Sequence, residues 1–202
     1  GQFIEGKWSP SENKETYEVI NPATEEVLGH ASKATPADVD RALKSAENGL
    51  KVWKKTTPWN RSYILRKIAD RMREKKDVLA KWMTLENGKP LAEGIGETNG
   101  AADIFEWNAE ETKRIFGQTI ESRFEDTRVH VYYQPVGVVA ALSPWNFPLV
   151  LAARKISTAL AAGCSVIIKP DTITPGVVME LVDICRECGV PPGAVNLLSG
   201  DP

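Results

Sequence analysis

Two polar clusters in the sequence contain residue types that could take part in chemistry. The first is Ser143-Pro144-Trp145-Asn146, and the second is Lys169-Pro170-Asp171-Thr172. A side-chain amide such as that of Asn146 can donate a hydrogen bond to an oxyanion that develops on a carbonyl group. A lysine such as Lys169 can hydrogen-bond a ribose or meet a ribose phosphate. The alternatives are a turn-forming asparagine between two prolines and a surface lysine at a strand end.

Each cluster directly follows a short apolar run that we expect to be a β-strand. The runs cover residues 136–142 and 165–168, and residues 149–162 between them have helical spacing. This pattern predicts a strand-helix-strand unit, which favours a parallel sheet with crossover helices. A second helix over 175–188 and a strand over 194–198 continue the pattern. Ligands of open parallel sheets bind beyond the carboxyl ends of the strands, where both clusters are expected to lie.

The residues before these strands predict short strands followed by helices. Residues 1–34 place apolar side chains between turn residues, as in short strands or extended arms. Helices are expected to begin at Thr35-Pro36 and Thr57-Pro58, because threonine caps a helix and proline suits its first position. A further helix is expected over about 91–116, and its first half is weakened by three glycines. Alternating apolar residues in 127–133 predict a strand exposed on one face.

The residues of the two clusters resemble the sequence motifs of a known family. The run Pro144-Trp145-Asn146-Phe147-Pro148, followed by Ile168-Lys169-Pro170, resembles the aldehyde dehydrogenase superfamily. The similarity extends from Asn21-Pro22-Ala23-Thr24 to Gly200-Asp201-Pro202, and it is greatest to dehydrogenases of the succinate-semialdehyde type. The resemblance implies NAD(P)-dependent oxidation of an aldehyde to the acid through a cysteine thioester.

The resemblance also implies roles for individual residues. Asn146 corresponds to the family's oxyanion donor. Lys169 and the residue at position 172 correspond to the groups that hold the adenine-side ribose. The remaining members of the two clusters line the cofactor in this interpretation: Ser143, Trp145, Pro170 and Asp171.

The residue at position 172 bears on the choice of cofactor. Members of the family that prefer NAD often carry glutamate there, whereas this chain has Thr172. A carboxylate would repel a 2′-phosphate, and a hydroxyl can donate a hydrogen bond to one. We therefore expect the cofactor to be NADP or NAD, with NADP tolerated. The neighbouring Asp171 keeps the alternative open, because a small backbone shift could present its carboxylate instead.

Arg154 is the residue most informative about the substrate. It lies eight residues after Asn146 on the expected crossover helix. By resemblance, members that act on succinate semialdehyde have arginine there, and its planar guanidinium suits a carboxylate. Other carboxylate-bearing semialdehydes would satisfy the same arginine. The alternative is that Arg154-Lys155 is a solvated basic pair, in an enzyme for another aldehyde.

The cysteines and histidines predict no catalytic thiol and no metal site. Cys164 precedes an apolar strand and is expected to be a small core residue. Cys185 and Cys188 have C-x-x-C spacing, but they lie at the expected carboxyl end of a helix, which does not favour a thiolate. By resemblance, the nucleophilic cysteine and the general-base glutamate belong to segments beyond this chain. A truncated, non-catalytic binding or assembly module is therefore a second class of interpretation.

The composition of the chain limits the remaining classes of function and location. The 202 residues carry 27 acidic and 25 basic side chains, for a formal net charge of −2, which argues against nucleic-acid binding. No apolar run has membrane-spanning length, and the amino terminus resembles no secretory signal, so a cytoplasmic location is expected. A removed transit peptide stays open.

The expected fold class is α/β: amino-terminal helices plus the first βαβαβ part of a Rossmann-like domain, with a β arm. The expected division is 1–118 for the amino-terminal part of the cofactor-binding domain, 119–135 for the arm and 136–202 for the βαβαβ part. By resemblance, the arm serves subunit assembly and implies a homo-oligomer, a dimer or tetramer. An ordinary hairpin strand is the alternative.

Overall fold

A five-stranded sheet carries both polar clusters. The computed structural model describes residues 1–201. Across the sheet the strand order is β2-β1-β9-β8-β7. Its strands are β1 (Gln2–Ile4), β2 (Lys7–Ser9), β7 (Val138–Leu142), β8 (Ser165–Lys169) and β9 (Val195–Leu197). β7, β8 and β9 run parallel, while β1 is antiparallel to both β9 and β2. The predicted parallel strands and the α/β fold class are confirmed, and the first residues of the chain complete the sheet.

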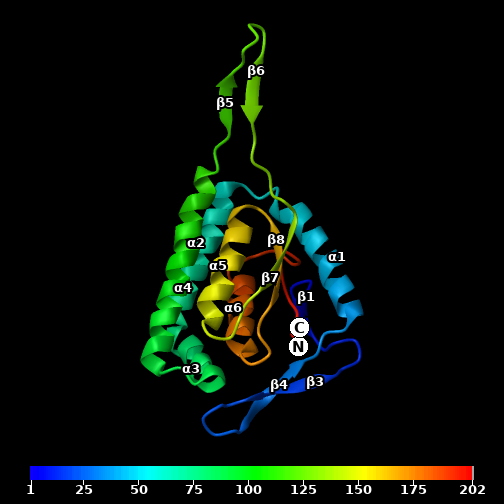
Figure 1. Cartoon of the computed structure of the whole chain (residues 1–202), viewed down its shortest axis with the longest axis vertical. Helices are drawn as coiled ribbons and strands as arrows, with labels where there is room; N and C mark the ends of the chain where they lie inside the picture. Colours follow the sequence, from blue (N-terminus) through cyan, green and yellow to red (C-terminus); the bar gives the residue numbers. More distant parts are fainter. Residues whose placement is uncertain (202) are drawn as a thin grey trace.

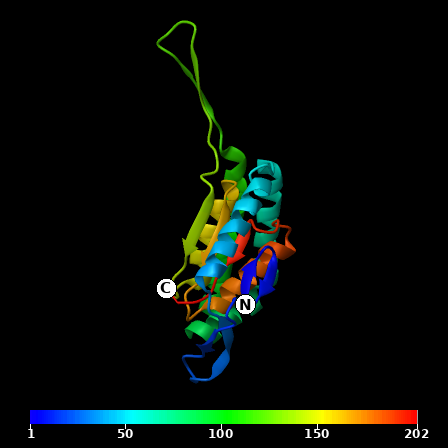
Figure 2. The same cartoon turned by 90° about the vertical axis from the view of Figure 1, so that its right-hand side faces the viewer.

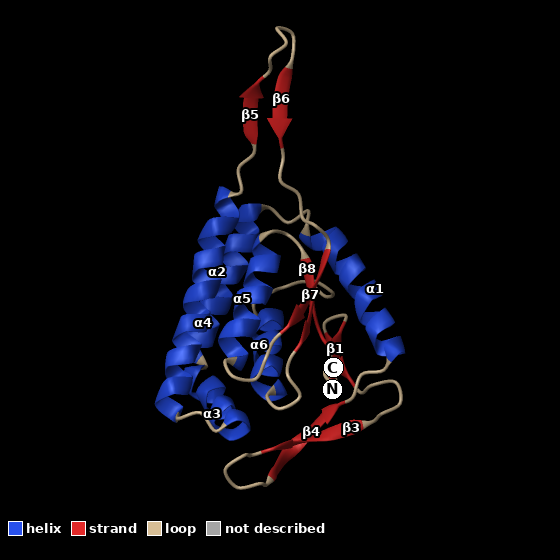
Figure 3. Ribbon diagram, viewed as in Figure 1, coloured by secondary structure: helices blue, strands red, loops and turns tan. Residues whose placement is uncertain are grey.

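Helices cover both faces of this sheet. The crossover helices α5 (Pro148–Ala161) and α6 (Pro175–Glu187) lie on one face, and α1 (Pro36–Trp53) lies on the other (Figure 1). Proline stands in the first turn of all three, where its missing N–H costs no intrahelical bond. Three further helices, α2 (Pro58–Glu74), α3 (Lys76–Asn87) and α4 (Leu91–Glu111), form an outer layer over α5 and α6 (Figure 3).

The core lies between the sheet and these helices. Its largest fully buried side chains come from both helical layers and the sheet and include Trp53, Leu65, Phe105, Leu149, Leu160 and Ile168. Trp53 also donates a hydrogen bond of 2.9 Å from its indole N–H to the carbonyl of Leu160, which ties α1 to the end of α5. The helix starts expected at Thr35 and Thr57 are confirmed, since both side chains accept bonds from the first turn.

The helix expected over 91–116 differs from the observed one. α4 ends at Glu111, and a short 3-10 turn, Thr112–Arg114, follows it, so residues 115–117 are not helical. The glycine-containing first half, by contrast, is regular helix. A Cβ atom at Gly94 would stand 3.1 Å from Cα of Ala80 on α3. Close packing between α3 and α4 therefore favours glycine there, which offsets its low helix propensity.

Two antiparallel hairpins extend from the body. β3 (Thr16–Ile20) pairs with β4 (Val27–Ser32), and β5 (Gln118–Glu121) pairs with β6 (Arg128–Val131). The β5–β6 hairpin, hereafter the arm, projects far beyond the helices (Figures 1 and 2). The strand expected over 127–133 is confirmed as β6, but its exposure on one face alone is wrong. Both faces of the arm are exposed apart from the half-buried Val131, because no other element of the described chain makes an extensive contact with it.

No helix among residues 1–201 is both long and apolar enough to cross a membrane.

Candidate functional site

The two polar clusters begin side by side. β7 and β8 are in register so that Leu142 pairs with Lys169, the last residue of each strand. The backbone N–H of Ser143 then donates a hydrogen bond of 3.1 Å to the carbonyl of Lys169. The Ser143 side chain is buried, and its hydroxyl has no hydrogen-bond partner among the described residues. The structure therefore brings the starts of both clusters to one edge of the sheet, and the first cluster begins with an unsatisfied hydroxyl.

Asn146 lies in an exposed turn between β7 and α5. Its backbone carbonyl accepts a hydrogen bond of 3.1 Å from Lys89, and the carbonyl of Trp145 accepts one of 3.0 Å from Asn87. Within residues 1–201 nothing hydrogen-bonds the side-chain amide of Asn146. The backbone of this turn is held in place, while the amide that could serve as a donor is left available.

Lys169 lines a groove of about 740 Å³ between α1 and the sheet. The lining comes from the first turns of α1, the outward face of β7 and the segment after β9, and it includes Thr35, Val39, Leu43, Val138, Ala140 and Ser199. The groove is mainly apolar, with Lys169 as its one basic side chain among the described residues. Its size falls within the range of about 300–1,000 Å³ that is usual for small-molecule sites.

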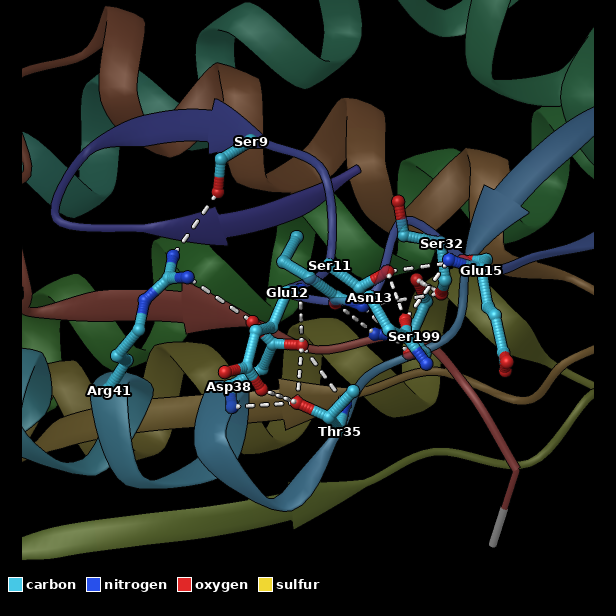
Figure 4. A network of polar contacts seen from close by, with 11 residues as sticks. Ser9, Ser11, Glu12, Asn13, Glu15, Ser32, Thr35, Asp38, Arg41 and Ser199 are labelled. Atoms are coloured by element: carbon cyan, nitrogen blue, oxygen red, sulfur yellow. Dashed lines mark hydrogen bonds and ion pairs between the residues drawn. The ribbon is translucent and has the colours of Figure 1, made fainter.

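A polar network fixes one wall of this groove. Figure 4 shows Thr35 and Asp38 at the start of α1 facing Glu12 and Arg41. Burial alone would raise the pKa of Asp38, but hydrogen bonds from the backbone of Thr35 and Glu12, together with Arg41, hold it below its usual value. The segment at Ser199 is held in the same region by a bond of 2.6 Å from its hydroxyl to the carbonyl of Ser32.

The remaining residues of the second cluster lie before α6 and do not line the groove. Asp171 accepts a hydrogen bond of 3.1 Å from the backbone N–H of Ile173, and its carbonyl accepts one from Thr174. Its carboxylate therefore stabilises the turn itself. Thr172 is half-buried, and no described residue bonds its hydroxyl.

The Arg154 side chain forms no hydrogen bond or ion pair with either cluster among the described residues. It is exposed on α5, forms no ion pair with any described residue, and lines a shallow depression beside β7 together with Val136 and Ala140. Its neighbour Lys155 reaches back to the carbonyl of Leu142 at the end of β7. Both residues are exposed, so the alternative of a solvated basic pair stays open, with Lys155 also bonded to the strand that precedes the first cluster.

Three buried charged residues near the clusters have no counterpart in the sequence-based interpretation. They are Glu86, Lys89 and Glu97. Glu86 accepts bonds of 2.7 and 3.2 Å from the backbone N–H groups of Gly176 and Val177, the first turn of α6. Glu97 does the same for Leu149 and Val150, the first turn of α5. No local signal in the sequence marked these three residues, because the run Asn87-Gly88-Lys89-Pro90 indicated only a helix end.

The cysteines are structural, as expected. Cys164, Cys185 and Cys188 are all buried and unpaired. Burial raises the pKa of the Cys185 thiol and of the Cys188 thiol, which opposes formation of a thiolate. Among residues 1–201 no group of three or more histidine, cysteine, aspartate or glutamate side chains is arranged to hold a metal ion.

Parallel strands joined by crossover helices, with polar clusters at their carboxyl ends, define this chain as a Rossmann-like α/β protein. The sequence pattern of the aldehyde dehydrogenase family matches residues 8–202, and the chain belongs to that family. The resemblance inferred from the two clusters is thereby confirmed.

Within this family, several individual proteins are similar to the chain over almost its whole length. Glutarate-semialdehyde dehydrogenase of Pseudomonas putida is 43% identical over 198 residues, covering 98% of this chain and 41% of that protein. Succinate-semialdehyde dehydrogenase (NADP+) GabD of Escherichia coli is also 43% identical, with the same coverage. The crystal structure of succinate-semialdehyde dehydrogenase from Burkholderia pseudomallei superposes with a TM-score of 0.98 at 40% identity, covering 100% of this chain and 42% of that one. This chain thus spans about 41% of the length of the curated relatives that it matches.

Proposed function

We propose that this chain supplies the oxyanion donor and the ribose-binding groups for NADP- or NAD-dependent oxidation of a carboxylate-bearing semialdehyde, such as succinate semialdehyde. The observation that carries the proposal is the adjacency of the two clusters, joined by the bond from Ser143 to Lys169, in a chain of this family. The names of relatives at 43% identity support the substrate class.

The residues present suit a dinucleotide. The Lys169 ammonium offers a polar group to the groove, whose apolar walls suit a planar base, and the unpartnered hydroxyl of Ser143 directly follows the strand that lines it. When bound, the dinucleotide accepts the hydride that leaves the aldehyde carbon. We propose that Lys169 and Thr172 hold its ribose, with Ser143, Trp145, Pro170 and Asp171 lining it. Because the Asp171 carboxylate already bonds Ile173, Thr172 is the better candidate for the 2′ position.

Asn146 has the role of oxyanion donor in this proposal. A cysteine thiolate attacks the aldehyde carbon, the carbonyl oxygen becomes an oxyanion, and the side-chain amide of Asn146 stabilises it. Loss of hydride from carbon gives a thioester, and water then releases the acid and restores the thiol. No described residue of this chain is assigned as the attacking thiol, because all three cysteines are buried.

Arg154 is proposed to bind the carboxylate of the substrate. Its guanidinium has no ion-pair partner among the described residues, which leaves its donors available for an anion. We further propose the domain division 1–118, 119–135 and 136–202, and a homo-oligomer, a dimer or tetramer, that uses the arm.

One assay tests the proposal as a whole. The purified full-length protein is supplied with NADP or NAD and with succinate semialdehyde, glutarate semialdehyde or an uncharged aldehyde of matched length. We expect reduced cofactor to form faster with the semialdehydes than with the uncharged aldehyde. No reduction with any aldehyde at saturating cofactor contradicts the proposal, and equal rates for charged and uncharged aldehydes contradict the substrate class alone.

A further inference from the structure

A buried ion pair lies directly beneath the turn that carries Asn146. Lys89 precedes α4 and Glu97 lies within it, and their side chains are 7% and 2% exposed. The Lys89 ammonium donates to Glu97 Oε2 and donates a second bond of 3.1 Å to the backbone carbonyl of Asn146. It also lies 4.2 Å from the ring centroid of Phe147, within the range of a cation–π contact. One ammonium group therefore contacts two consecutive residues of the turn and a fixed counter-charge.

Glu97 holds the other end of the same segment. Its Oε1 atom accepts hydrogen bonds of 2.9 Å from Leu149 and 3.0 Å from Val150. These are among the first N–H groups of α5, which have no partner inside the helix, and Phe147 at the N-cap provides no side-chain cap. A negative charge also suits the amino-terminal end of a helix. The ion pair thus holds the backbone on both sides of Phe147.

Stability alone is a weak explanation for this pair, because apolar residues of similar volume often replace a buried ion pair without loss. An apolar pair could not, however, supply a donor to the carbonyl of residue 146 and an acceptor for two amides. The Asn146 side chain has no hydrogen-bond partner of its own within residues 1–201, so among these residues only its backbone is anchored.

We infer that Lys89 is a positioning residue: paired with Glu97, it fixes the backbone of Asn146 and hence the direction in which the side-chain amide meets the reacting carbonyl. The inference rests on the proposed role of Asn146 as oxyanion donor. Asn87 adds a second anchor through its bond to the carbonyl of Trp145.

A double-mutant cycle in the active protein tests this inference. The variants are Lys89→Met, Asn146→Ala and the combination, assayed for kcat and KM with succinate semialdehyde and NADP. A small misplacement of a catalytic group can cost about 100-fold in rate, so we expect Lys89→Met to lower kcat about tenfold to 100-fold. The KM for NADP should stay unchanged, because Lys89 contacts no residue of the second cluster. In the Asn146→Ala background, Lys89→Met should change kcat by less than about twofold, since the two residues act as one unit.

The results of this cycle distinguish failure of the inference about Lys89 from failure of the proposed function. Equal losses of kcat from Lys89→Met in both backgrounds overturn the inference and show that Lys89 supports the fold independently of Asn146. If the native protein oxidises no aldehyde, the proposed function itself has failed. Lys81→Met, which removes an exposed lysine of α3, is the matched control and should leave kcat and the melting temperature unchanged. If Lys89→Met does not fold, the same cycle with Lys89→Arg decides the question, because arginine keeps the charge opposite Glu97 but cannot place its donor at the same point.

Discussion

The carboxylate of Glu86 on α3 accepts a hydrogen bond of 2.7 Å from the backbone N–H of Gly176, ninety positions along the chain. A second bond, of 3.2 Å, comes from Val177. The first turn of α6 is therefore capped by a residue of the helical layer, and α6 is the helix that follows the second polar cluster.

Glu86 makes the stability of the protein depend on pH. Burial raises the pKa of Glu86 to about 7 from its ordinary value of 4.5, although the two backbone bonds oppose the shift. A group whose folded pKa is raised favours folding most when it is protonated, so its contribution is complete below about pH 4.5 and is lost as pH rises through 7. Tyr17 also faces this carboxylate, but burial raises the pKa of Tyr17 to about 12, so it stays neutral in this window.

Replacing Glu86 by glutamine should remove this dependence. Glutamine keeps an acceptor for Gly176 and Val177 but does not titrate. Between pH 4.5 and 7 the free energy of unfolding of the native protein should fall relative to that of Glu86→Gln, by at most about 1.4 kcal/mol per pH unit. Urea unfolding at several pH values measures the difference. Glu93→Gln, at an exposed position of α4, is the control. Parallel pH profiles for the native protein and Glu86→Gln would show that Glu86 is not the titrating group.

The predictions from the sequence agree best with the structure where the spacing of apolar residues determines the type of element. Alternating and helical apolar patterns predicted β7, α5, β8 and α6 to within about two residues, because each element buries one continuous apolar face. The same patterns placed the two clusters at strand ends, and the strand register then brought Ser143 beside Lys169.

The buried charged residues that bond the backbone near the clusters could not be predicted from periodicity. Glu86, Lys89 and Glu97 bond backbone groups at least 50 residues away in sequence, at Gly176, Asn146 and Leu149. Nothing local distinguishes them from solvated charges, because their role arises only when α3 and α4 pack against α5 and α6. Gly94 of α4 could not be interpreted from the sequence for the same reason, since its contact with Ala80 is tertiary.

The cofactor assignment predicts an unequal effect of a new charge at position 172. In Thr172→Glu, the added carboxylate should repel the 2′-phosphate of NADP and leave NAD without a like charge nearby. We expect the Kd of NADP to rise about tenfold or more relative to that of NAD, because two like charges in partly buried surroundings cost on the order of 1 to 3 kcal/mol. Fluorescence titration with each cofactor measures both constants.

Thr172→Gln is the matched control, because it has the size of glutamate without the charge and should affect NADP and NAD alike. Equal loss of affinity for the two cofactors in Thr172→Glu would mean that Thr172 does not face the 2′ position. In that case Asp171→Asn becomes the informative variant, since Asp171 is the carboxylate next to it.

The substrate assignment predicts a selective change in Arg154→Ala. A hydrogen-bonded charge contact contributes about 1.5 to 3 kcal/mol, so the KM for succinate semialdehyde should rise about tenfold to 100-fold. The KM for an uncharged aldehyde should stay within about twofold, because Arg154 is exposed and bonds no other described side chain. Arg154→Lys should fall between the two, as it keeps the charge but not the planar pair of donors. Equal effects on charged and uncharged aldehydes would remove Arg154 from the substrate site.

The proposed role of the arm predicts that a substitution in it can disrupt assembly of the oligomer without unfolding the chain. The pairs Ile120–Val129 and Gln118–Val131 lie on one face of this hairpin, and Thr119–His130 lies on the other. The arm therefore presents an apolar face that no described element covers. In Val129→Asp a charge on that face should dissociate the oligomer, because burying it at a subunit contact would cost several kcal/mol. Val129 belongs to no core cluster, so the substitution should leave the core packing of the separated subunit intact. Its melting temperature should therefore show no loss that comes from the core.

Sedimentation velocity on Val129→Asp and on Thr119→Asp makes the comparison. Thr119→Asp adds the same charge on the polar face of the same hairpin, so it should leave the assembly intact. A native protein that sediments as a single subunit would contradict the proposed oligomer. Equal dissociation by both variants would point to general charge repulsion on the arm, and the apolar face would then not be the contact.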